Sequence, residues 1–224
     1  MKNLYILTKN WIQGNKMTQP INVMNGLLYI NNQQVPFLDN PVPKYSEGVN
    51  TCEYIICHYT GGTTVQSAHN TYLDPTTQVS WHLSVSRDGD VTQLLSFDKV
   101  AWHAGASSWG TGPQALVGMN KYSIGVEHSN CGPLTEKNGA YVTAFGQVVP
   151  NIDVGFDQNG NPWQLYSPQQ LAASKYLILN LARILKVKDI LGHEQIATPI
   201  GRKKDPGPMY WDTLADIRKT YANS

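Results

Sequence analysis

Short apolar runs bounded by polar residues alternate along this chain with segments whose apolar residues recur at helical spacing. The short runs predict β-strands, and these cover residues 53–57, 79–86, 91–95, 123–128 and 190–191. The helical spacing predicts three α-helices, over residues 65–73, 168–186 and 211–221. From about residue 49 onward, the pattern therefore favours a compact domain of mixed α/β type.

The predicted helices carry residues that commonly begin and end helices. Ser167 precedes the longest helix, and Pro168 takes its first position, where a backbone N–H group has no helical partner in any case. Thr63 or Thr64 can cap the helix that follows them, and Asp74 with its following proline ends that helix. These signals support two of the helices independently of the hydrophobic pattern.

The chain divides into an arm, residues 1–48, and a main domain, residues 49–224. Within the arm, residues 26–38 are predicted to form a short β-hairpin with a turn made of two asparagines. Within the main domain, residues 132–165 are rich in glycine, asparagine and proline and are expected to form a long loop or irregular hairpin. Long loops of this kind in a compact domain are often functional.

The composition narrows the class of protein. With 224 residues, 41% of them hydrophobic, the chain can bury a substantial core without disulfide bonds. Lys and Arg total 17 against 16 Asp and Glu, so the net charge is +1. This balance excludes a nucleic-acid binder that depends on bulk positive charge, and no nucleic-acid partner is expected. The cysteines, Cys52, Cys57 and Cys131, make no disulfide framework and are expected to be reduced.

Two features bear on where the protein acts. No apolar run approaches the ~18–20 residues that a membrane helix needs, so no membrane span is expected. The apolar stretch at residues 4–7 is shorter than the ~7–15 residues at the centre of a secretory signal. We therefore expect synthesis in the cytoplasm without a standard signal peptide.

Candidate chemistry lies where predicted strands end. His58 directly follows an apolar strand, and His193 follows the strand over residues 190–191. Such strand ends commonly carry functional residues, although a solvated histidine is the alternative for each, and the two can meet only if their strands adjoin. Asp205 is the third candidate, because two imidazoles and a carboxylate form a standard zinc site with an open fourth position. Its Asp-Pro-Gly-Pro context is also typical of an ordinary turn.

Glu127 and Lys203 are candidates for the surrounding chemistry. Strand alternation places Glu127 on the same face as Gly125, where a glycine leaves open space, and this suits a general base beside a metal. The same alternation directs His128 to the opposite face, so His128 is not counted as a ligand. Lys203 can point into the same cleft as Asp205 and stabilise an oxyanion. The alternatives are an ion pair for Glu127 and a solvated charge for Lys203.

Two other histidines are interpreted differently. His82 alternates with Trp81 and Leu83 in a strand pattern, and it is interpreted as a structural histidine with satisfied hydrogen bonds. His103 lies in the loop-like stretch Ala-Trp-His-Ala-Gly and could instead line a substrate groove.

Short motifs distributed along the main domain occur in the order found in one known family. They are Ile-Ile-Cys-His-Tyr-Thr at 55–60, Val-Ser-Trp-His-Leu at 79–83, Ser-Arg-Asp-Gly at 86–89, Ala-Trp-His-Ala-Gly at 101–105, Ser-Ile-Gly-Val-Glu at 123–127, Gly-His-Glu at 192–194 and Arg-Lys-Lys-Asp-Pro-Gly-Pro at 202–208. Together they resemble the zinc-dependent N-acetylmuramoyl-L-alanine amidases of the type-2 amidase family. That family includes peptidoglycan-recycling amidases, phage lysozyme-like amidases and animal peptidoglycan recognition proteins. Each motif alone is weak, but their shared order over about residues 50–215 is specific.

The resemblance implies a fold, a cofactor and residue roles. The implied fold is a central mixed β-sheet flanked by helices. The implied cofactor is one Zn²⁺ ion bound by His58, His193 and Asp205, with Glu127 as the catalytic acid/base and Lys203 as the cationic stabiliser. An aspartate as the third ligand, in place of a cysteine, is similar to the recycling branch of the family.

The resemblance also implies contacts with substrate. Arg202 and His103 match positions that line the glycan–peptide groove, and Thr60 and Trp81 are assigned as further substrate contacts. Trp81 departs from the family pattern, since some relatives have a catalytic tyrosine there and tryptophan has no comparable hydroxyl. This departure puts more weight on Glu127. Residues 1–48 match no family motif.

The implied function is zinc-dependent hydrolysis of the amide bond between N-acetylmuramic acid and L-alanine, by a monomer acting on peptidoglycan or muropeptides. The extra arm favours a phage or prophage endolysin released through a holin to act in the periplasm or on the cell wall. A cytosolic muropeptide-recycling amidase and an effector carried by a secretion machine are the alternative settings. A non-catalytic peptidoglycan-binding module is the main alternative of another class, but the complete ligand set favours an enzyme. No His-Glu-x-x-His motif supports a zinc peptidase.

Overall fold

The centre of the molecule is a five-stranded mixed β-sheet, seen in a computed structural model that describes residues 19–224. The strand order is β17-β5-β11-β6-β7, in which the first four strands are parallel and β7 is antiparallel to β6. The bounds are Asp189–Gly192 for β17, Tyr54–Tyr59 for β5, Ser123–His128 for β11, Leu83–Val85 for β6 and Val91–Gln93 for β7.

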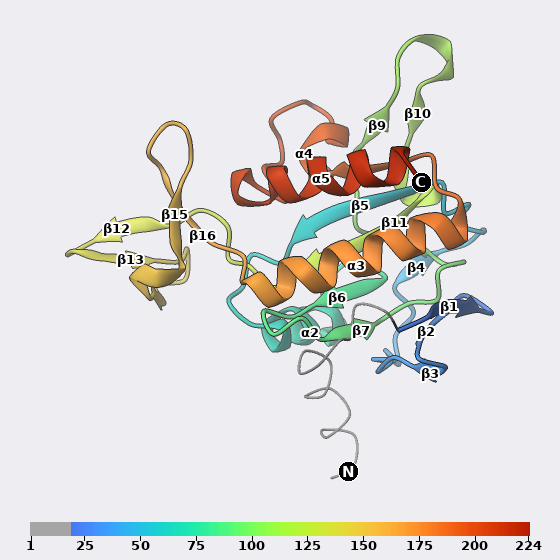
Figure 1. The fold of residues 1–224 in the computed structure, drawn as a ribbon, viewed down its shortest axis with the longest axis horizontal. Helices are drawn as coiled ribbons and strands as arrows, with labels where there is room; N and C mark the ends of the chain where they lie inside the picture. Colours follow the sequence, from blue (N-terminus) through green and yellow to red (C-terminus); the bar gives the residue numbers. More distant parts are fainter. Residues whose placement is uncertain (1–18) are drawn as a thin grey trace.

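Two long helices, α3 (Pro168–Leu185) and α5 (Trp211–Ala222), lie side by side across one face of this sheet (Figure 1). The main hydrophobic core lies between these helices and the sheet, and it includes Ile55 and Cys57 of β5. Because side chains alternate along a strand, Ile56 and His58 face the other side, where Ile56 joins a second, smaller cluster. The expected α/β fold, a central mixed sheet flanked by helices, is therefore confirmed.

The predicted helix caps are also confirmed. The Thr64 side chain accepts a hydrogen bond from the N–H of Ser67 at the start of α2 (Val65–Leu73). The Ser167 side chain accepts one from the N–H of Gln170 at the start of α3. Each cap satisfies one backbone donor that the first turn of a helix leaves without a partner.

The strand predicted over residues 79–86 is too long, because only Leu83–Val85 joins the sheet as β6. Ser80 pairs with a different segment: its N–H donates to the carbonyl of Trp102, and its hydroxyl oxygen accepts from the N–H of Trp102. An extended segment that bonds to a loop has the same alternating pattern as one that bonds to a strand. The hydrophobic pattern therefore could not mark this boundary.

The described part of the arm packs against the main domain. Its strands β1 (Ile21–Met24), β2 (Leu27–Ile30) and β3 (Gln33–Gln34) form a small sheet, and β4 (Tyr45–Ser46) pairs with β8 (Val100–Ala101). Leu28 is fully buried in the main core, and its N–H donates to the side chain of Gln93 on β7 over 2.8 Å. The arm thus covers the edge strand of the central sheet, an edge that would otherwise expose unpaired backbone groups.

The predicted hairpin in the arm is confirmed in part. Residues Asn31 and Asn32 form the expected turn, with φ values of 52° and 58°. A second turn at Asn25 and Gly26, which the prediction did not include, joins β1 to β2. The arm residues 1–18, with the N-terminal apolar stretch, lie outside the described residues.

Residues 132–165 are more regular than the predicted long loop or irregular hairpin. They form two small antiparallel sheets, which lie together beyond one end of α3 (Figure 1): β12 (Thr135–Lys137), β13 (Ala140–Val142) and β14 (Val148–Val149), then β15 (Val154–Phe156) and β16 (Pro162–Gln164). Asn138 and Gly139, with φ values of 52° and 75°, make the turn between β12 and β13. An Asn-Gly pair is a strong hairpin signal that the composition-based interpretation overlooked.

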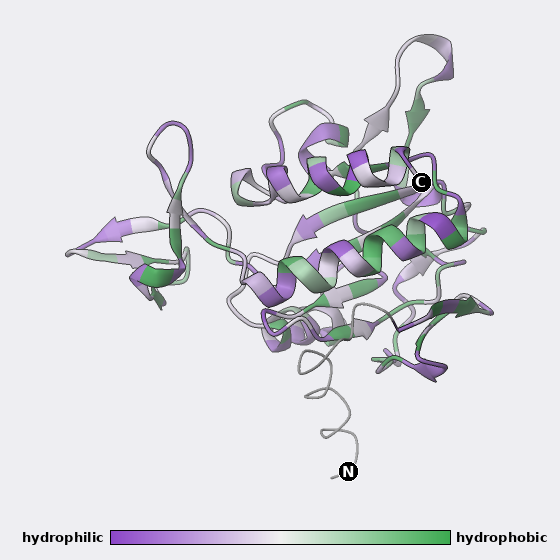
Figure 2. Cartoon of the chain, in the orientation of Figure 1, coloured by the Kyte–Doolittle hydropathy of each residue, from purple (hydrophilic) through white to green (hydrophobic). Residues whose placement is uncertain are grey.

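Short elements complete the chain: β9 (Ser108–Trp109) paired with β10 (Leu116–Val117), α4 (His193–Ile196), and the 3₁₀ turns η1 (Gly112–Gln114), η2 (Met119–Lys121), η3 (Asn151–Asp153) and η4 (Pro208–Tyr210). Hydrophobic residues follow the central strands and alternate with hydrophilic ones along α3 (Figure 2). Within residues 19–224, none of the helices combines the length and apolar character needed to cross a membrane.

Candidate metal centre

The parallel strands bring the candidate residues to one end of the sheet. His58 of β5 lies directly beside Glu127 of β11 in the strand register. On the other side of β5, Gly192 at the end of β17 lies beside Cys57, so His193 follows next to His58. The two histidines meet because β17 and β5 are neighbouring strands. The sequence predicted that they could meet only in that case. The carboxyl ends of parallel strands are the usual location of ligand sites in such sheets.

Three potential metal-binding atoms converge at this point. The Nδ1 atoms of His58 and His193 lie 3.1 Å apart, and each lies 2.9 Å from Oδ2 of Asp205. All three residues are buried. In a tetrahedral zinc site with bonds of ~2.0–2.1 Å, neighbouring ligand atoms lie about 3.3 Å apart. The spacing of the three donors therefore fits one zinc ion.

The tautomer of the His193 ring is selected by a backbone carbonyl. Its Nε2 lies 3.0 Å from the carbonyl oxygen of Ala104, which can only accept a hydrogen bond. A neutral His193 therefore carries its proton on Nε2. Its Nδ1, which faces His58 and Asp205, is left with a lone pair.

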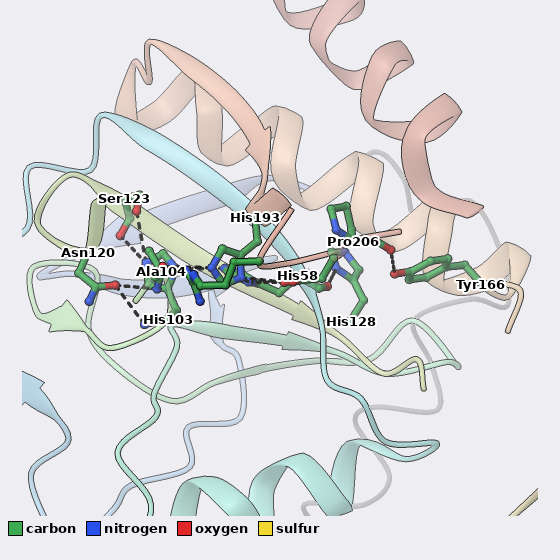
Figure 3. Close-up of polar contacts among 11 residues, drawn as sticks. His58, His103, Ala104, Asn120, Ser123, His128, Tyr166, His193 and Pro206 are labelled. Atoms are coloured by element: carbon green, nitrogen blue, oxygen red, sulfur yellow. Dashed lines mark hydrogen bonds and ion pairs between the residues drawn. The ribbon is translucent and has the colours of Figure 1, made fainter. Parts of the chain in front are cut away.

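The protonation of His58 is fixed through a second histidine (Figure 3). The hydroxyl of Ser123 donates to the carbonyl of Met119 over 2.6 Å, so both oxygens of Ser123, each 3.3 Å from Nε2 of His103, can only accept from that nitrogen. His103 therefore carries its proton on Nε2, and its Nδ1 accepts from Nε2 of His58 over 3.0 Å. This leaves a lone pair on Nδ1 of His58, as in His193.

Two imidazole lone pairs and a carboxylate oxygen thus face one another. Burial lowers the pKa of His58 to about 4, which keeps this imidazole neutral near pH 7. Three acceptors in contact repel one another unless a cation lies between them. Neutral imidazoles and a carboxylate whose outer atoms are held by hydrogen bonds are the usual donor set of a catalytic zinc site.

The approach of Asp205 to the two histidines depends on its neighbours. A side chain at Gly192 would lie 2.6 Å from Cδ of Pro206, so only glycine lets this segment approach β17 so closely. The Tyr166 hydroxyl donates to the carbonyl of Pro206 over 2.7 Å, and the N–H of Glu194 donates to the carbonyl of Asp205 over 2.9 Å. Both contacts hold the backbone on the C-terminal side of the Asp205 side chain.

Glu127 carries an unpartnered carboxylate oxygen beside this centre. Its Oε2 is buried and has no hydrogen-bond partner within residues 19–224. Burial, with a contribution from the nearby Asp205 charge, raises the pKa of Glu127 to about 8, while Lys203 acts in the opposite direction. A carboxylate whose pKa lies near neutrality is suited to accepting and returning a proton.

The reason given in the sequence interpretation for the space around Glu127 is wrong. A Cβ atom on Gly125 would lie 2.6 Å from Cγ of His103, so the room left by this glycine is filled by the His103 ring. The glycine therefore serves the close packing of His103 rather than an opening beside Glu127.

Two adjoining cavities of about 520 Å³ and 440 Å³ lead to the centre. Lys203, which is exposed, lines both of them together with Trp102, His103 and His193. The larger cavity also reaches Glu127 and Asp205. The two cavities thus place a basic side chain and aromatic residues beside the three potential metal-binding atoms.

The residues assigned to substrate contact occupy different positions around this cleft. Thr60 lines the larger cavity, and its hydroxyl donates to the carbonyl of Gly62 over 3.1 Å. Trp81 lies in the wall, 5% exposed, with its indole N–H donating to the Ser84 hydroxyl. Arg202 borders both cavities, but its guanidinium donates to the carbonyls of Thr198, Ala104 and Ala106. His103 borders both cavities while contacting His58.

Sequence reasoning missed the residues that orient the histidines through hydrogen bonds, either directly or through a neighbouring residue. Ala104 and Ser123 contribute backbone oxygens, which no side-chain pattern reveals. Asn120 accepts hydrogen bonds from the N–H groups of His103 and Ala104, and it lies three residues before the Ser-Ile-Gly-Val-Glu motif at 123–127. This proximity to a motif was the signal that the sequence offered.

Comparison with known proteins identifies the family to which the chain belongs. The profile of the family described as N-acetylmuramoyl-L-alanine amidase matches residues 48–208, which is more than half of the chain. The chain therefore belongs to the N-acetylmuramoyl-L-alanine amidase family, of the type-2 class that its motifs resemble.

Individual relatives are similar over part of their length. The chain is 30% identical over 133 residues to the 1,6-anhydro-N-acetylmuramyl-L-alanine amidase AmpD of Escherichia coli strain K12, a match covering 59% of this chain and 54% of that protein. The chain thus spans about half the length of the curated relatives it matches.

Solved structures show the same fold. One is the Escherichia coli amidase AmiD in complex with the substrate anhydro-N-acetylmuramic acid-L-Ala-D-gamma-Glu-L-Lys, with a TM-score of 0.55 and 24% identity over 88% of this chain and 65% of that chain. Another is a mutant endolysin from Bacillus subtilis, with a TM-score of 0.51 and 21% identity over 84% of this chain and 99% of that chain.

Proposed function

We propose that this protein is a zinc-dependent N-acetylmuramoyl-L-alanine amidase. The observation that carries the proposal is the convergence of three lone-pair donors, on His58, His193 and Asp205, next to Glu127, whose Oε2 has no hydrogen-bond partner among the described residues. One Zn²⁺ ion would be held by Nδ1 of each histidine and Oδ2 of Asp205. Membership of the amidase family supports the choice of reaction.

The bond to be cleaved is the amide between the lactyl group of N-acetylmuramic acid and the nitrogen of L-alanine. A bound zinc ion supplies Lewis acidity, which polarises a carbonyl and makes a water molecule more acidic. Glu127 accepts one proton as the water oxygen bonds to the lactyl carbonyl carbon, and it returns that proton to the alanine nitrogen as the carbon–nitrogen bond breaks. The products are a muramic carboxylate and a peptide with a free amino terminus.

Lys203 is proposed to act on the oxygen of the former carbonyl. It lines the cleft, and its charge acts on both Glu127 and His58. An ammonium group at this location stabilises the negative oxygen that develops in the tetrahedral intermediate. Thr60, Trp81, His103 and Arg202 are proposed to border the bound glycan and peptide.

The proposed setting is lysis of the cell wall by an endolysin that acts, as a monomer, in the periplasm or on the wall. The similarity in fold to an endolysin supports this setting. The identity to an enzyme named for 1,6-anhydro-N-acetylmuramyl-L-alanine favours a second candidate, the recycling of anhydro-muropeptides. Both settings use the same bond cleavage.

The test is digestion of two substrates by the purified protein. Intact peptidoglycan sacculi and soluble anhydro-muropeptides are incubated with it, and mass spectrometry identifies the products. We expect release of stem peptides that begin with L-alanine, loss of this release with EDTA, and recovery when zinc is restored. Faster release from sacculi supports the endolysin, and faster release from anhydro-muropeptides supports recycling.

Two results would overturn the proposal. Cleavage within the stem peptide would show a peptidase. Binding of sacculi without any cleavage, in protein that holds one zinc ion, would show a peptidoglycan-binding module.

A further inference from the structure

Asn120 borders the smaller of the two cavities and makes no hydrogen bond to His58, His193 or Asp205. Its side-chain oxygen Oδ1 accepts two hydrogen bonds, from the N–H of His103 over 3.1 Å and from the N–H of Ala104 over 2.7 Å. Two donors directed at one atom identify that atom as the amide oxygen. A single side chain thus holds two consecutive residues of the backbone (Figure 3).

Those two residues act on different ligands. The His103 side chain accepts a hydrogen bond from Nε2 of His58, and the Ala104 carbonyl accepts one from Nε2 of His193. Both contacts place the imidazole proton on Nε2 and turn the lone pair of Nδ1 toward the metal position. By holding the backbone of His103 and Ala104, Asn120 therefore supports the Nε2-protonated tautomer of both His58 and His193.

The segment held by Asn120 has little freedom on its other sides. The His103 ring lies against Gly125, where even a Cβ atom would lie 2.6 Å from Cγ of the ring. Arg202 donates to the carbonyls of Ala104 and Ala106 over 3.4 Å and 2.7 Å. In a segment packed this closely, a small displacement of the backbone moves the atoms that contact His58 and His193.

We propose that Asn120 is a positioning residue that orients both histidine ligands by holding the backbone of His103 and Ala104. The proposal rests on the proposed function, because it takes zinc as the ion that the histidines bind. Loss of the two hydrogen bonds would let the His103–Ala104 segment move and allow each imidazole to populate the wrong tautomer. Removal of a direct hydrogen-bond partner of a metal ligand commonly lowers metal affinity by about 10–100-fold, and Asn120 holds two such partners, the His103 ring and the Ala104 carbonyl.

The experiment compares two substitutions of equal size. Asn120→Leu removes the acceptor oxygen, whereas Asn120→Asp keeps an acceptor in the same place. Zinc affinity is measured by competition with a chromophoric chelator, in the absence of any substrate. We expect the dissociation constant to rise about 10–100-fold in Asn120→Leu and to stay within about threefold of the unsubstituted protein in Asn120→Asp.

A second measurement does not depend on zinc. Histidine ¹⁵N spectra of the metal-free protein report which ring nitrogen carries the proton. We expect His58 and His193 to be protonated on Nε2 in the unsubstituted protein and in Asn120→Asp, and to become mixtures in Asn120→Leu. If Asn120→Leu does not fold, Asn120→Ala takes its place in both measurements.

The matched control is Asn40→Leu. Asn40 is also half-buried and accepts a backbone N–H, that of Val42, but it lies in the arm away from the metal centre. This control should leave zinc affinity and tautomers unchanged. Unchanged affinity and tautomers in Asn120→Leu, or an Asn120→Asp protein as weak as Asn120→Leu, would overturn the inference. Failure of the unsubstituted protein to bind zinc would instead count against the proposed function, and the tautomer spectra would still test Asn120.

Discussion

Two pairs of buried histidines lie in or beside the same sheet, and they differ in what their ring nitrogens contact. In His58 and His193, the outer nitrogen has a protein partner, and the inner Nδ1 faces the other imidazole and a carboxylate. In His82 and His128, both nitrogens have partners that complete their hydrogen bonding. The four residues are buried to a similar degree, so burial does not separate them.

In His82 and His128, here called the structural pair, each ring nitrogen has a named hydrogen-bond partner. Nδ1 of His82 accepts from the N–H of Gly125 over 3.0 Å, and its Nε2 donates to the carbonyl of Lys99 over 3.0 Å. Nδ1 of His128 donates to the carbonyl of His58 over 2.9 Å, and its Nε2 lies 2.7 Å from the Ser174 hydroxyl. Each ring therefore has one donor and one acceptor position, both satisfied, as a neutral imidazole requires.

The difference shows what defines the candidate metal centre. A histidine whose two nitrogens are satisfied has no lone pair left for an ion, whatever its distance from other ligands. His58 and His193 keep one lone pair each, and the two lone pairs share one space with Asp205. The free Nδ1 lone pairs beside the Asp205 carboxylate, rather than the number of histidines, therefore mark the candidate metal site.

The strongest test of this comparison is removal of one histidine from each pair. We expect His193→Ala to lose stoichiometric zinc binding and to lower amidase activity by more than about 10³-fold, since a three-ligand site cannot hold the ion with two ligands. His82→Gln should keep one zinc ion per chain. Zinc content is measured by mass spectrometry of the dialysed protein. One zinc ion per chain in His193→Ala would remove this residue from the site.

A smaller loss of activity is expected when Glu127, beside the candidate metal centre, is replaced by an uncharged residue of the same shape. Glu127→Gln keeps the shape of the side chain but cannot accept a proton, so kcat should fall about 10²–10⁴-fold with zinc still bound. Turnover of muropeptides and zinc content are measured on the same preparation. Activity close to that of the unsubstituted protein would exclude Glu127 as the acid/base.

The smallest expected effect concerns acid stability and the structural pair. Burial lowers the pKa of His82 and of His128 from 6.5 to about 4. Between these values the unfolded chain binds protons that the folded chain excludes, so the free energy of unfolding is largest above pH 6.5 and falls as the pH approaches 4. Thermal unfolding of the metal-free protein should therefore show a Tm that declines over this range.

The same measurement on His82→Gln isolates one contribution. Glutamine does not titrate, so the decline of Tm between pH 6.5 and 4 should become shallower in this variant. The buried His58 acts in the same direction as the structural pair. A Tm that stays constant from pH 7.5 to pH 4.5 in the unsubstituted protein would contradict the assignment of neutral buried rings.

Most helices and the central strands could be predicted from local pattern. The caps at Thr64 and Ser167 and the strand at Ser123–His128 lie where the sequence placed them. The predictions failed where an extended segment pairs with a loop, as before β6, and where Asn-Gly turns make regular hairpins in residues 132–165. Local pattern reports which residues are apolar, but it does not report which backbone groups will pair.

The sequence by itself determined the α/β alternation, the strand-end positions of the histidines and, through the order of its motifs, the family. Only the tertiary structure decided that β17 adjoins β5, so that His193 reaches His58. It alone decided which nitrogen of each ring is free, because the partners, the His103 ring for His58 and the Ala104 carbonyl for His193, lie far along the chain. The sequence specifies the chemical type of each side chain, whereas the tautomer of each histidine depends on hydrogen-bond partners that only folding brings close.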